Sequence, residues 1–125
     1  MKPVLIDSDV LIEVLRARDR NILARWGELS QDDTPLFCSP VTIAEIWHGA
    51  LPHEQSTLSA LFSSLQSVPI DSVIGRRAGD YLKRYAKSHN LELGDALIAG
   101  TASLHSLVLW TRNRKHYPMR DIEIF

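Results

Sequence analysis

The stretch VLIDSDVLIEVLR, residues 4–16, contains the change of pattern that decides the fold. Val4 to Ile6 are consecutive aliphatic residues, as in a short buried strand. After Asp9 the apolar residues recur at helical spacing. The stretch therefore predicts a strand, a tight turn that carries Asp7 and Asp9, and a helix that begins near Val10.

The same pattern continues along the chain, where predicted strands alternate with predicted helices. This order is typical of an α/β fold, in which a parallel sheet has helices on its faces. We expect a mostly parallel sheet of four to five short strands. Beyond the first pair, the predicted helices are 22–29, 41–50, 58–65, 72–88 and 95–105, and the predicted strands are 36–38, 68–70, 107–110 and 122–125.

Length, charge and cysteine content limit the classes of protein to consider. The 125 residues fit one domain, 1–125, with one core. A net charge of −1 and a pI of about 6.5 argue against binding long duplex DNA through bulk charge, although a local basic patch is compatible with them. Cys38 is the only cysteine, which excludes an internal disulfide and a cysteine-based zinc site.

The sequence shows no pattern of export or membrane insertion. An acidic residue is present by position 7, within the region that a signal peptide would occupy. No apolar run reaches the length that crosses a bilayer. We therefore expect a cytoplasmic protein with no membrane partner.

The acids of the first turn have an ordinary structural explanation as well as a functional one. Asp9 or Ser8 could cap the helix that begins near Val10, and we favour that role for Asp9 because capping is the commonest use of Asp before a helix. Asp7 directly follows a predicted strand, where open α/β sheets bind ligands. A functional role is therefore the stronger hypothesis for Asp7.

Further polar residues are predicted to reach the same edge of the sheet. Glu45 lies in the helix after the second strand, Asp95 opens a helix antiparallel to the strands, and Asn113 follows the strand at 107–110. Solvent exposure explains Glu45 alone, and the preference of Asp for a first helical turn explains Asp95 alone. Together with Asp7, the two acids predict one acidic cluster at the carboxyl edge of the sheet.

The charge of such a cluster must be offset by solvent, by a helix N-terminus or by a cation. Carboxylate oxygens without His or Cys suit Mg²⁺, for which Mn²⁺ can substitute. The ion can polarise a phosphate oxygen and lower the pKa of a bound water. Hydrolysis of phosphodiester bonds is the chemistry that this arrangement favours.

Four segments in this order carry a resemblance to a known family: LIDSDVLIE (5–13), SPVTIAEIWHG (39–49), LELGDALIAGTA (91–102) and LVLWTRNRKHY (107–117). The chain resembles a PIN domain, and closely a VapC-type toxin of type II toxin–antitoxin pairs. The resemblance covers nearly the whole chain. It implies a three-layer α/β/α fold and a Mg²⁺-dependent endoribonuclease.

The resemblance also implies roles for individual residues. By motif position Asp7, Glu45 and Asp95 would be catalytic metal ligands. Asn113 would occupy a fourth catalytic position, where many members have Asp, so the site has one charge fewer and a tightly held second metal is in doubt. The basic run 112–116 would guide the phosphate backbone, or would be a solvated loop. The residues expected to contact substrate are Ser8, Thr111, Arg112, Arg114 and Lys115.

Partners follow from the same resemblance. A ribonuclease toxin needs an inhibitor, which implies a VapB-type antitoxin in addition to an RNA substrate, and the family resemblance implies a homodimer. The apolar residues of 53–66 and the helix around Trp26 are the surface we expect an antitoxin to cover, unless they pack on the core. Trp26, Trp47 and Trp110 are expected to be core residues.

Two other functions stay open. The Asp7-Ser8-Asp9 motif resembles the first motif of haloacid-dehalogenase-type phosphatases, in which Asp7 would be the nucleophile and Asp9 the acid/base. That family also needs a strand that ends in Ser or Thr, a later Lys and a terminal acidic pair. Thr111 and Lys115 could serve as the first two, but only Asp121 and Glu123 follow, and the chain is short for the family. A catalytically weak PIN domain that serves as a binding module is favoured slightly by Asn113, and disfavoured by the three intact acids.

Overall fold

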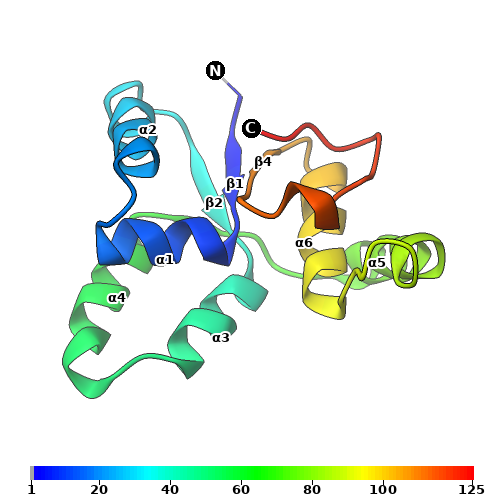
Figure 1. The fold of residues 1–125 in the computed structure, drawn as a ribbon, viewed down its shortest axis with the longest axis horizontal. Coiled ribbons are helices and arrows are strands. Elements are labelled where there is room, and N and C mark those ends of the chain that lie inside the picture. The colour runs from blue at the N-terminus through cyan, green and yellow to red at the C-terminus, as the bar shows by residue number, and fades with distance from the viewer. Residues whose placement is uncertain (1) are drawn as a thin grey trace.

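The computed structural model describes residues 2–125 and builds them around a four-stranded parallel sheet with strand order β3-β2-β1-β4 (Figure 1). Helices cover both faces of this sheet, which gives the α/β/α layers expected from the sequence. The strands are β1 (Val4–Ile6), β2 (Leu36–Cys38), β3 (Gln66–Ser67) and β4 (Val108–Trp110). The helices are α1 (Ser8–Arg16), α2 (Arg20–Gln31), α3 (Pro40–His48), α4 (Gln55–Ser63), α5 (Ser72–Tyr85) and α6 (Leu93–Leu104), with 3₁₀ turns η1 (Pro52–Glu54) and η2 (Arg114–His116).

Strand β1 is central, and its residues are buried on both faces. Leu5 is paired with Phe37 of β2 and Leu109 of β4, in parallel register. Because successive side chains of a strand point to opposite faces, Leu5 packs in one core cluster, while Val4 and Ile6 pack in the other. The parallel register brings the carboxyl ends of β1, β2 and β4 to one edge of the sheet.

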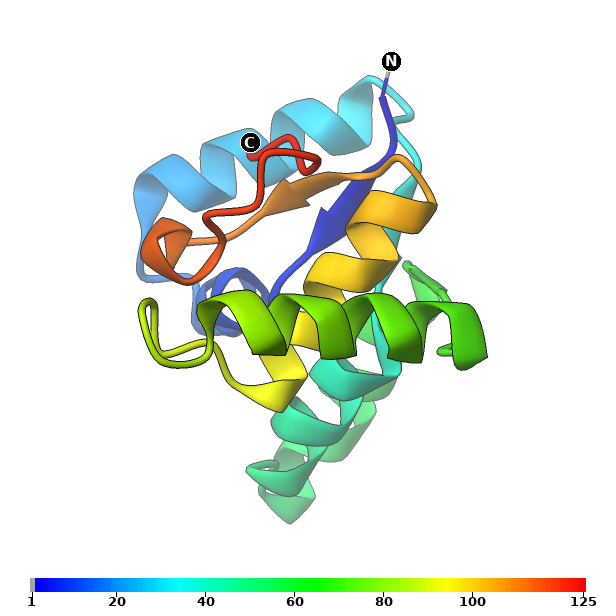
Figure 2. The ribbon, with the colours of Figure 1, turned by 90° about the vertical axis from the view of Figure 1, so that its right-hand side faces the viewer.

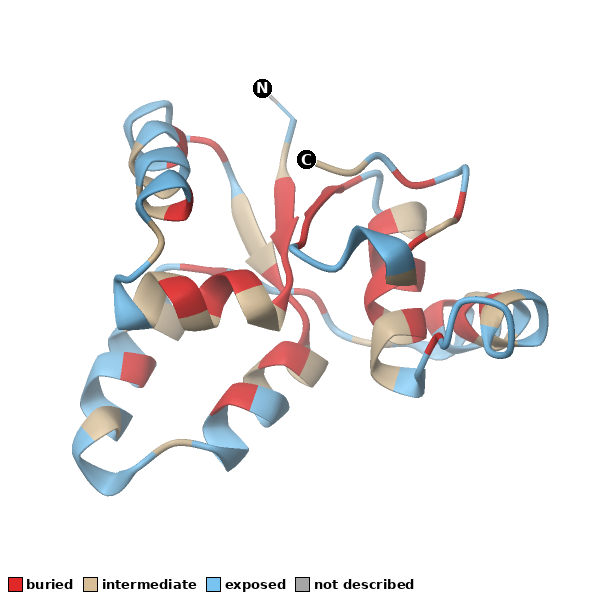
Figure 3. Cartoon of the chain, viewed as in Figure 1, coloured by how far each residue is buried: buried red, intermediate tan, exposed pale blue. Residues whose placement is uncertain are grey.

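The two core clusters divide the helices between the faces. The cluster on one side unites Leu5 with residues of α5, α6 and the C-terminal segment. The cluster on the other side unites Val4 and Ile6 with residues of α1 to α4. Figure 3 shows the buried residues on β1 and β4 and on the inward faces of the helices.

The small residues of α6 allow a close approach to α5. A Cβ atom added to Gly100 would lie 3.1 Å from the backbone oxygen of Ile74, which leaves little room for any side chain. Figure 2 shows α5 crossing α6. Small residues of α6 also face the sheet. Ala96 and Ala99 do pack with Leu5 and Leu109, but the tightest contact is between the two helices.

Two predicted strands differ from the structure. The third strand is Gln66–Ser67 rather than 68–70, because Pro69 has no N–H to extend the ladder beyond the bond from Val68 N to the Cys38 oxygen. The segment 122–125 forms a single parallel bridge between Ile124 and Leu109 instead of a strand. The sheet of four strands still lies within the expected number.

The observed burial also bears on two predictions about apolar side chains. Trp47 is 42% exposed and is not a core residue, because the helical face it shares is not covered by another element. In the segment 53–66, Leu58 and Leu65 are buried in the core, and Leu61 and Phe62 pack against it. Leu58 and Leu65 therefore stabilise the fold, whereas Leu61 and Phe62 are half-buried and keep part of their apolar surface exposed. Within residues 2–125, no helix has both the length and the apolar character that crossing a membrane demands.

Candidate active site

Asp7 directly follows β1 and is the N-cap of α1. Its Oδ1 atom accepts a hydrogen bond of 2.8 Å from the Ser8 N–H, and its backbone is extended (φ −74°, ψ 158°). The prediction that Asp9 or Ser8 caps this helix is therefore wrong, since the helix begins two residues earlier than expected. The cap fixes the Asp7 carboxylate at the carboxyl edge of the sheet.

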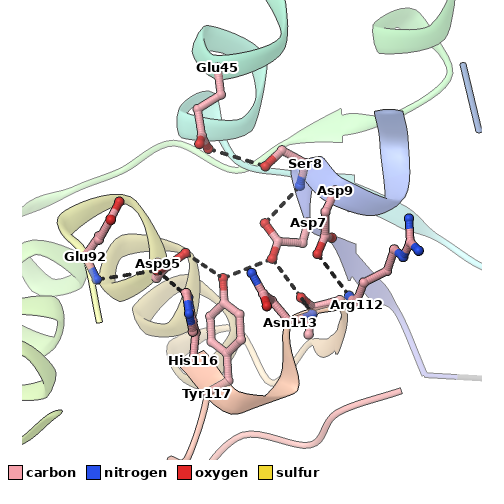
Figure 4. A network of polar contacts seen from close by, with 11 residues as sticks. Asp7, Ser8, Asp9, Glu45, Glu92, Asp95, Arg112, Asn113, His116 and Tyr117 are labelled. Carbon is pink, nitrogen blue, oxygen red and sulfur yellow. Dashed lines mark hydrogen bonds and ion pairs between the residues drawn. The ribbon is translucent and has the colours of Figure 1, made fainter. Parts of the chain in front are cut away.

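The other oxygen of Asp7 is held by two hydroxyl groups. Thr111 Oγ1 donates over 2.9 Å and the Tyr117 hydroxyl over 3.0 Å to Asp7 Oδ2 (Figure 4). Thr111 directly follows β4, the neighbour of β1, so the parallel pairing places it beside Asp7. Burial raises the pKa of Asp7 more than these hydrogen bonds lower it. The site therefore holds an oriented carboxylate that lacks full solvation.

Asp95 lies in the first turn of α6 and faces Asp7 across Tyr117. The Tyr117 hydroxyl is 3.3 Å from Asp95 Oδ1, and His116 Nδ1 is 3.2 Å from Asp95 Oδ2. One hydroxyl proton can serve only one carboxylate at a time, so the two acids share this donor. Burial and the charges of Asp7 and Asp95 raise the pKa of Tyr117, which stays neutral. Tyr117 thus separates two negative charges with a permanent donor.

Glu45 approaches the same region from α3. Its Oε1 atom is 3.5 Å from Ser8 Oγ, a long hydrogen bond, and the residue is exposed. Partial desolvation, followed by the charges of Asp7 and Asp95, raises the pKa of Glu45. In Figure 4 the carboxylates of Asp7, Glu45 and Asp95 are directed from three different elements toward one open region. The structure thus brings together the three acids that the sequence predicted.

The donor set fits a hard divalent cation in its chemistry. All three acids offer carboxylate oxygens, and burial, with a smaller part from the neighbouring acids, raises the pKa of both Asp7 and Glu45, an effect that a cation would oppose. Within residues 2–125 no group of three or more Asp, Glu, His or Cys side chains lies close enough together to hold a metal ion as placed. The fit to a cation is therefore one of ligand chemistry and not of coordination geometry.

Asp9 and Glu13 of α1 both contact Arg112, which lies in the loop that follows β4. Asp9 Oδ2 accepts the backbone N–H of Arg112 (3.1 Å), and Glu13 Oε1 lies 3.2 Å from the guanidinium of the same residue. Asp9 and Glu13 are four residues apart, on one face of α1. Arg18 also contacts Glu13, at 2.9 Å. We call this group, Asp9, Glu13 and Arg112, the α1 clamp.

The α1 clamp changes the expected role of Arg112 and of Asp9. The Arg112 side chain runs toward Glu13, away from the three carboxylates in Figure 4, so it is not directed at a substrate there. Burial, then the charge of Asp7, raises the pKa of Asp9 to about 6. Its Oδ1 atom is buried and has no hydrogen-bond partner among the described residues. Through its Oδ2 atom Asp9 is thus placed to hold the loop.

The remaining predicted site residues lie at the rim. The Asn113 backbone N–H donates to Thr111 Oγ1 over 3.0 Å, and Asn113 itself is exposed. Arg114 and Lys115 are exposed on η2. Of the predicted set, the structure gathers around the open region Asp7, Ser8, Glu45, Asp95, Thr111 and Asn113.

Sequence reasoning missed the role of Tyr117. It closes the last recognised segment, four residues after Asn113, and the 3₁₀ turn η2 carries it back beneath Asp7 and Asp95. A tyrosine directly after a basic run, in a segment already assigned to the site, was the available signal. Glu13 was missed as well, since an acid within an apolar helix gives no indication of its partner.

The fold and the acidic site together define a class of protein. Residues 4–122 match the profile of the PIN domain family, and the chain belongs to that family. It is 43% identical over 121 residues to ribonuclease VapC10 of Mycobacterium tuberculosis (strain H37Rv), covering 93% of this chain and 86% of that protein. It is 27% identical over 137 residues to toxin FitB of Neisseria gonorrhoeae, covering 98% of this chain and 96% of that protein.

Solved structures of related proteins have the same fold. A toxin–antitoxin complex from Klebsiella pneumoniae contains a chain that is 29% identical, with a TM-score of 0.70 and coverage of 97% of this chain and 99% of that one. DNA-bound VapBC from Salmonella typhimurium contains a chain with a TM-score of 0.82 at 21% identity, covering 100% of this chain and 98% of that one. The latter likeness concerns the fold alone.

Proposed function

We propose that the protein is a metal-dependent endoribonuclease and the toxin of a toxin–antitoxin pair. The observation that carries this proposal is the convergence of Asp7, Glu45 and Asp95 on one open region. The 43% identity to a ribonuclease, over most of both chains, supports the same activity. RNA phosphodiester bonds would be the substrate, and the whole chain, 1–125, would act as one PIN domain in the cytoplasm.

Mg²⁺ is the cofactor we propose, with Mn²⁺ as a substitute. Asp7, Glu45 and Asp95 would hold it, because their oxygens are the ligands that these ions prefer. The bound ion would supply charge neutralisation at the phosphate and activation of water. Asn113 adds no charge, so we propose one firmly held ion.

The surrounding residues would keep the acids ready for this role. The Ser8 N–H, Thr111 and Tyr117 fix both oxygens of Asp7 and hold its carboxylate in one orientation. Because the carboxylate is already oriented before the substrate binds, no free energy is needed to orient it during the reaction. Asn113 would contact the substrate with its side-chain amide, and Ser8 with its hydroxyl.

A VapB-type antitoxin is the partner we propose, and a homodimer the assembly. The support comes from the toxin–antitoxin complexes among the structural relatives. Exposed apolar side chains are available on α3 and just after it, at Trp47 and Leu51, although position i+2 puts Trp47 on a different face of the helix from Glu45. A partner segment that wraps around α3 and places a basic side chain against Glu45 would neutralise the acids and close the site.

RNA cleavage tests the proposed activity. Purified protein should cleave a single-stranded RNA in Mg²⁺ or Mn²⁺, and EDTA should abolish the cleavage. A phosphomonoester assayed in parallel should not be hydrolysed. RNA that stays intact in both metals would refute the nuclease, and phosphomonoester hydrolysis would restore the phosphatase hypothesis.

Co-expression with the neighbouring gene tests the toxin role. The two products should copurify, and light scattering during size-exclusion chromatography should show a mass that fits a dimer of the nuclease with bound antitoxin. A monomer that neither binds the neighbouring product nor loses activity in its presence would remove the toxin role and leave the nuclease intact.

A further inference from the structure

A groove of about 610 Å³ opens beside the acidic site, between the turn that connects α5 to α6 and the segment around η2. Its ionisable lining residues are Lys87, His89, Arg114, Lys115 and His116, and we call it the basic groove. Figure 2 shows the two chain segments side by side, although more than twenty residues separate them in the sequence. Asn90, at a φ of 53°, makes the sharp turn that brings Lys87 and His89 to this position.

All ionisable side chains that line the basic groove are basic. None of the described residues that line it is acidic, although the chain as a whole has a net charge of −1. Lys87, Arg114 and Lys115 are exposed and have no carboxylate partner within residues 2–125. Arg112, by contrast, is paired with Glu13. The free positive charge beside the site is therefore concentrated in the basic groove.

The basic groove begins where the acidic site ends. His116 belongs to both, since its ring lines the groove and its Nδ1 atom lies 3.2 Å from Asp95 Oδ2. A polyanion in the groove would thus continue into the open region at Asp7 and Asp95. Lys and Arg bind phosphate oxygens without reading the base sequence, and single-stranded RNA carries one phosphate per nucleotide.

We propose that the basic groove binds the phosphate backbone of the RNA strand on one side of the scissile bond. This inference rests on the proposed ribonuclease function. It gives the strand a path across the surface, which runs from the three carboxylates past His116 and over the α5–α6 turn. It also places Lys87, which no motif of the sequence marks, in the substrate-binding surface.

RNA binding without cleavage tests this proposal. The probe is a fluorescein-labelled single-stranded RNA, titrated with protein in EDTA and followed by fluorescence anisotropy at several salt concentrations. The double variant Lys87→Ala/Lys115→Ala should bind more weakly. The slope of log K against log salt should become shallower by about 1.4, because each lost phosphate contact removes about 0.7 for a single strand.

A matched control removes the same charge elsewhere. Arg20 and Arg76 are exposed, lie outside the basic groove and have no ion-pair partner among the described residues. Arg76 is about 13 Å before the end of α5. Arg20→Ala/Arg76→Ala should keep the wild-type affinity and slope. Equal losses in both double variants, unchanged binding in the groove variant, or no RNA binding by the wild type would overturn the proposal.

Cleavage in Mn²⁺ separates this proposal from the proposed function. RNA that binds through the basic groove but is never cleaved would refute the nuclease and leave the groove standing. If Lys87→Ala/Lys115→Ala cleaves RNA with an unchanged KM, the proposed role of the groove is refuted, while the nuclease activity is not.

Discussion

The hydroxyl of Tyr117 lies 3.0 Å from Asp7 Oδ2, although 110 residues separate them in the sequence. The same hydroxyl is 3.3 Å from Asp95 Oδ1, so one neutral donor stands between two acids of the site. Two carboxylates this close repel each other, and the donor reduces that cost. Tyr117 therefore stabilises the acidic site when no cation is bound.

Tyr117→Phe should lower the free energy of unfolding in EDTA by about 1.5–3 kcal/mol, the contribution of a hydrogen bond to a charged group. Urea denaturation measures this. Tyr85→Phe is the control, since Tyr85 is half-buried beside His89 and its hydroxyl makes no hydrogen bond to any of the three acids. Equal stability of Tyr117→Phe and wild type would contradict the bridging role.

The α1 clamp should behave as one coupled unit. Glu13→Gln and Arg112→Ala each remove part of the same ion pair, so their effects on unfolding should be non-additive by about 0.5–1 kcal/mol. A double-mutant cycle by urea denaturation measures the coupling. Additive effects would mean that the ion pair contributes nothing to the position of the loop.

Arg112→Ala should also leave the salt dependence of RNA binding unchanged. The guanidinium is paired with Glu13 and is not directed toward the open region. Fluorescence anisotropy in EDTA provides the slope. A slope shallower by about 0.7 would show that Arg112 contacts a phosphate after all.

Asn113→Asp restores a negative charge at the fourth position. We expect Mn²⁺ to bind more tightly, by about tenfold or 1.4 kcal/mol, as measured by calorimetric titration. The direction of the change in activity is open, because tighter binding of a cofactor does not by itself stabilise a transition state. An unchanged affinity would place Asn113 outside the reach of the ion.

Substitution by alanine should change the stability of the protein in opposite directions at Gly100 and at Gly75. A Cβ at Gly100 would meet the Ile74 oxygen at 3.1 Å, so Gly100→Ala should lower stability by about 1–3 kcal/mol. At Gly75 the added Cβ meets nothing within 4 Å, and Gly75→Ala should raise stability by about 0.5–1 kcal/mol. Thermal unfolding of both variants checks the pair, and a stabilised Gly100→Ala would show that α5 and α6 can separate.

The fold was largely predictable because its periodicity is strong. The aliphatic strands β1 and β4 and the amphipathic α1 and α5 follow directly from residue spacing. The edge strand was displaced because the apolar residues around Pro69 were given more weight than the absence of its N–H. Trp47 was misplaced because sequence indicates that a residue is apolar and does not indicate whether another element covers it.

The site was predictable in its acids and much less so in its supporting contacts. Parallel topology gives one edge to all strand ends, which was enough to bring Asp7, Glu45 and Asp95 together. The contacts of Tyr117, Glu13 and Arg112 depend on how the loop after β4 folds back over α1. The spacing of apolar residues in the sequence does not predict how this loop folds back.

The most direct test of the central claim is calorimetric titration of Mn²⁺ into wild type, Asp7→Asn, Glu45→Gln and Asp95→Asn. Each substitution keeps the size of the side chain and removes one charge, and Asp33→Asn, at an exposed loop position, serves as control. If the three carboxylates share one ion, wild type and Asp33→Asn bind Mn²⁺ alike, and each of the other variants loses binding together with RNA cleavage. Undiminished Mn²⁺ binding by Asp95→Asn would contradict the shared site.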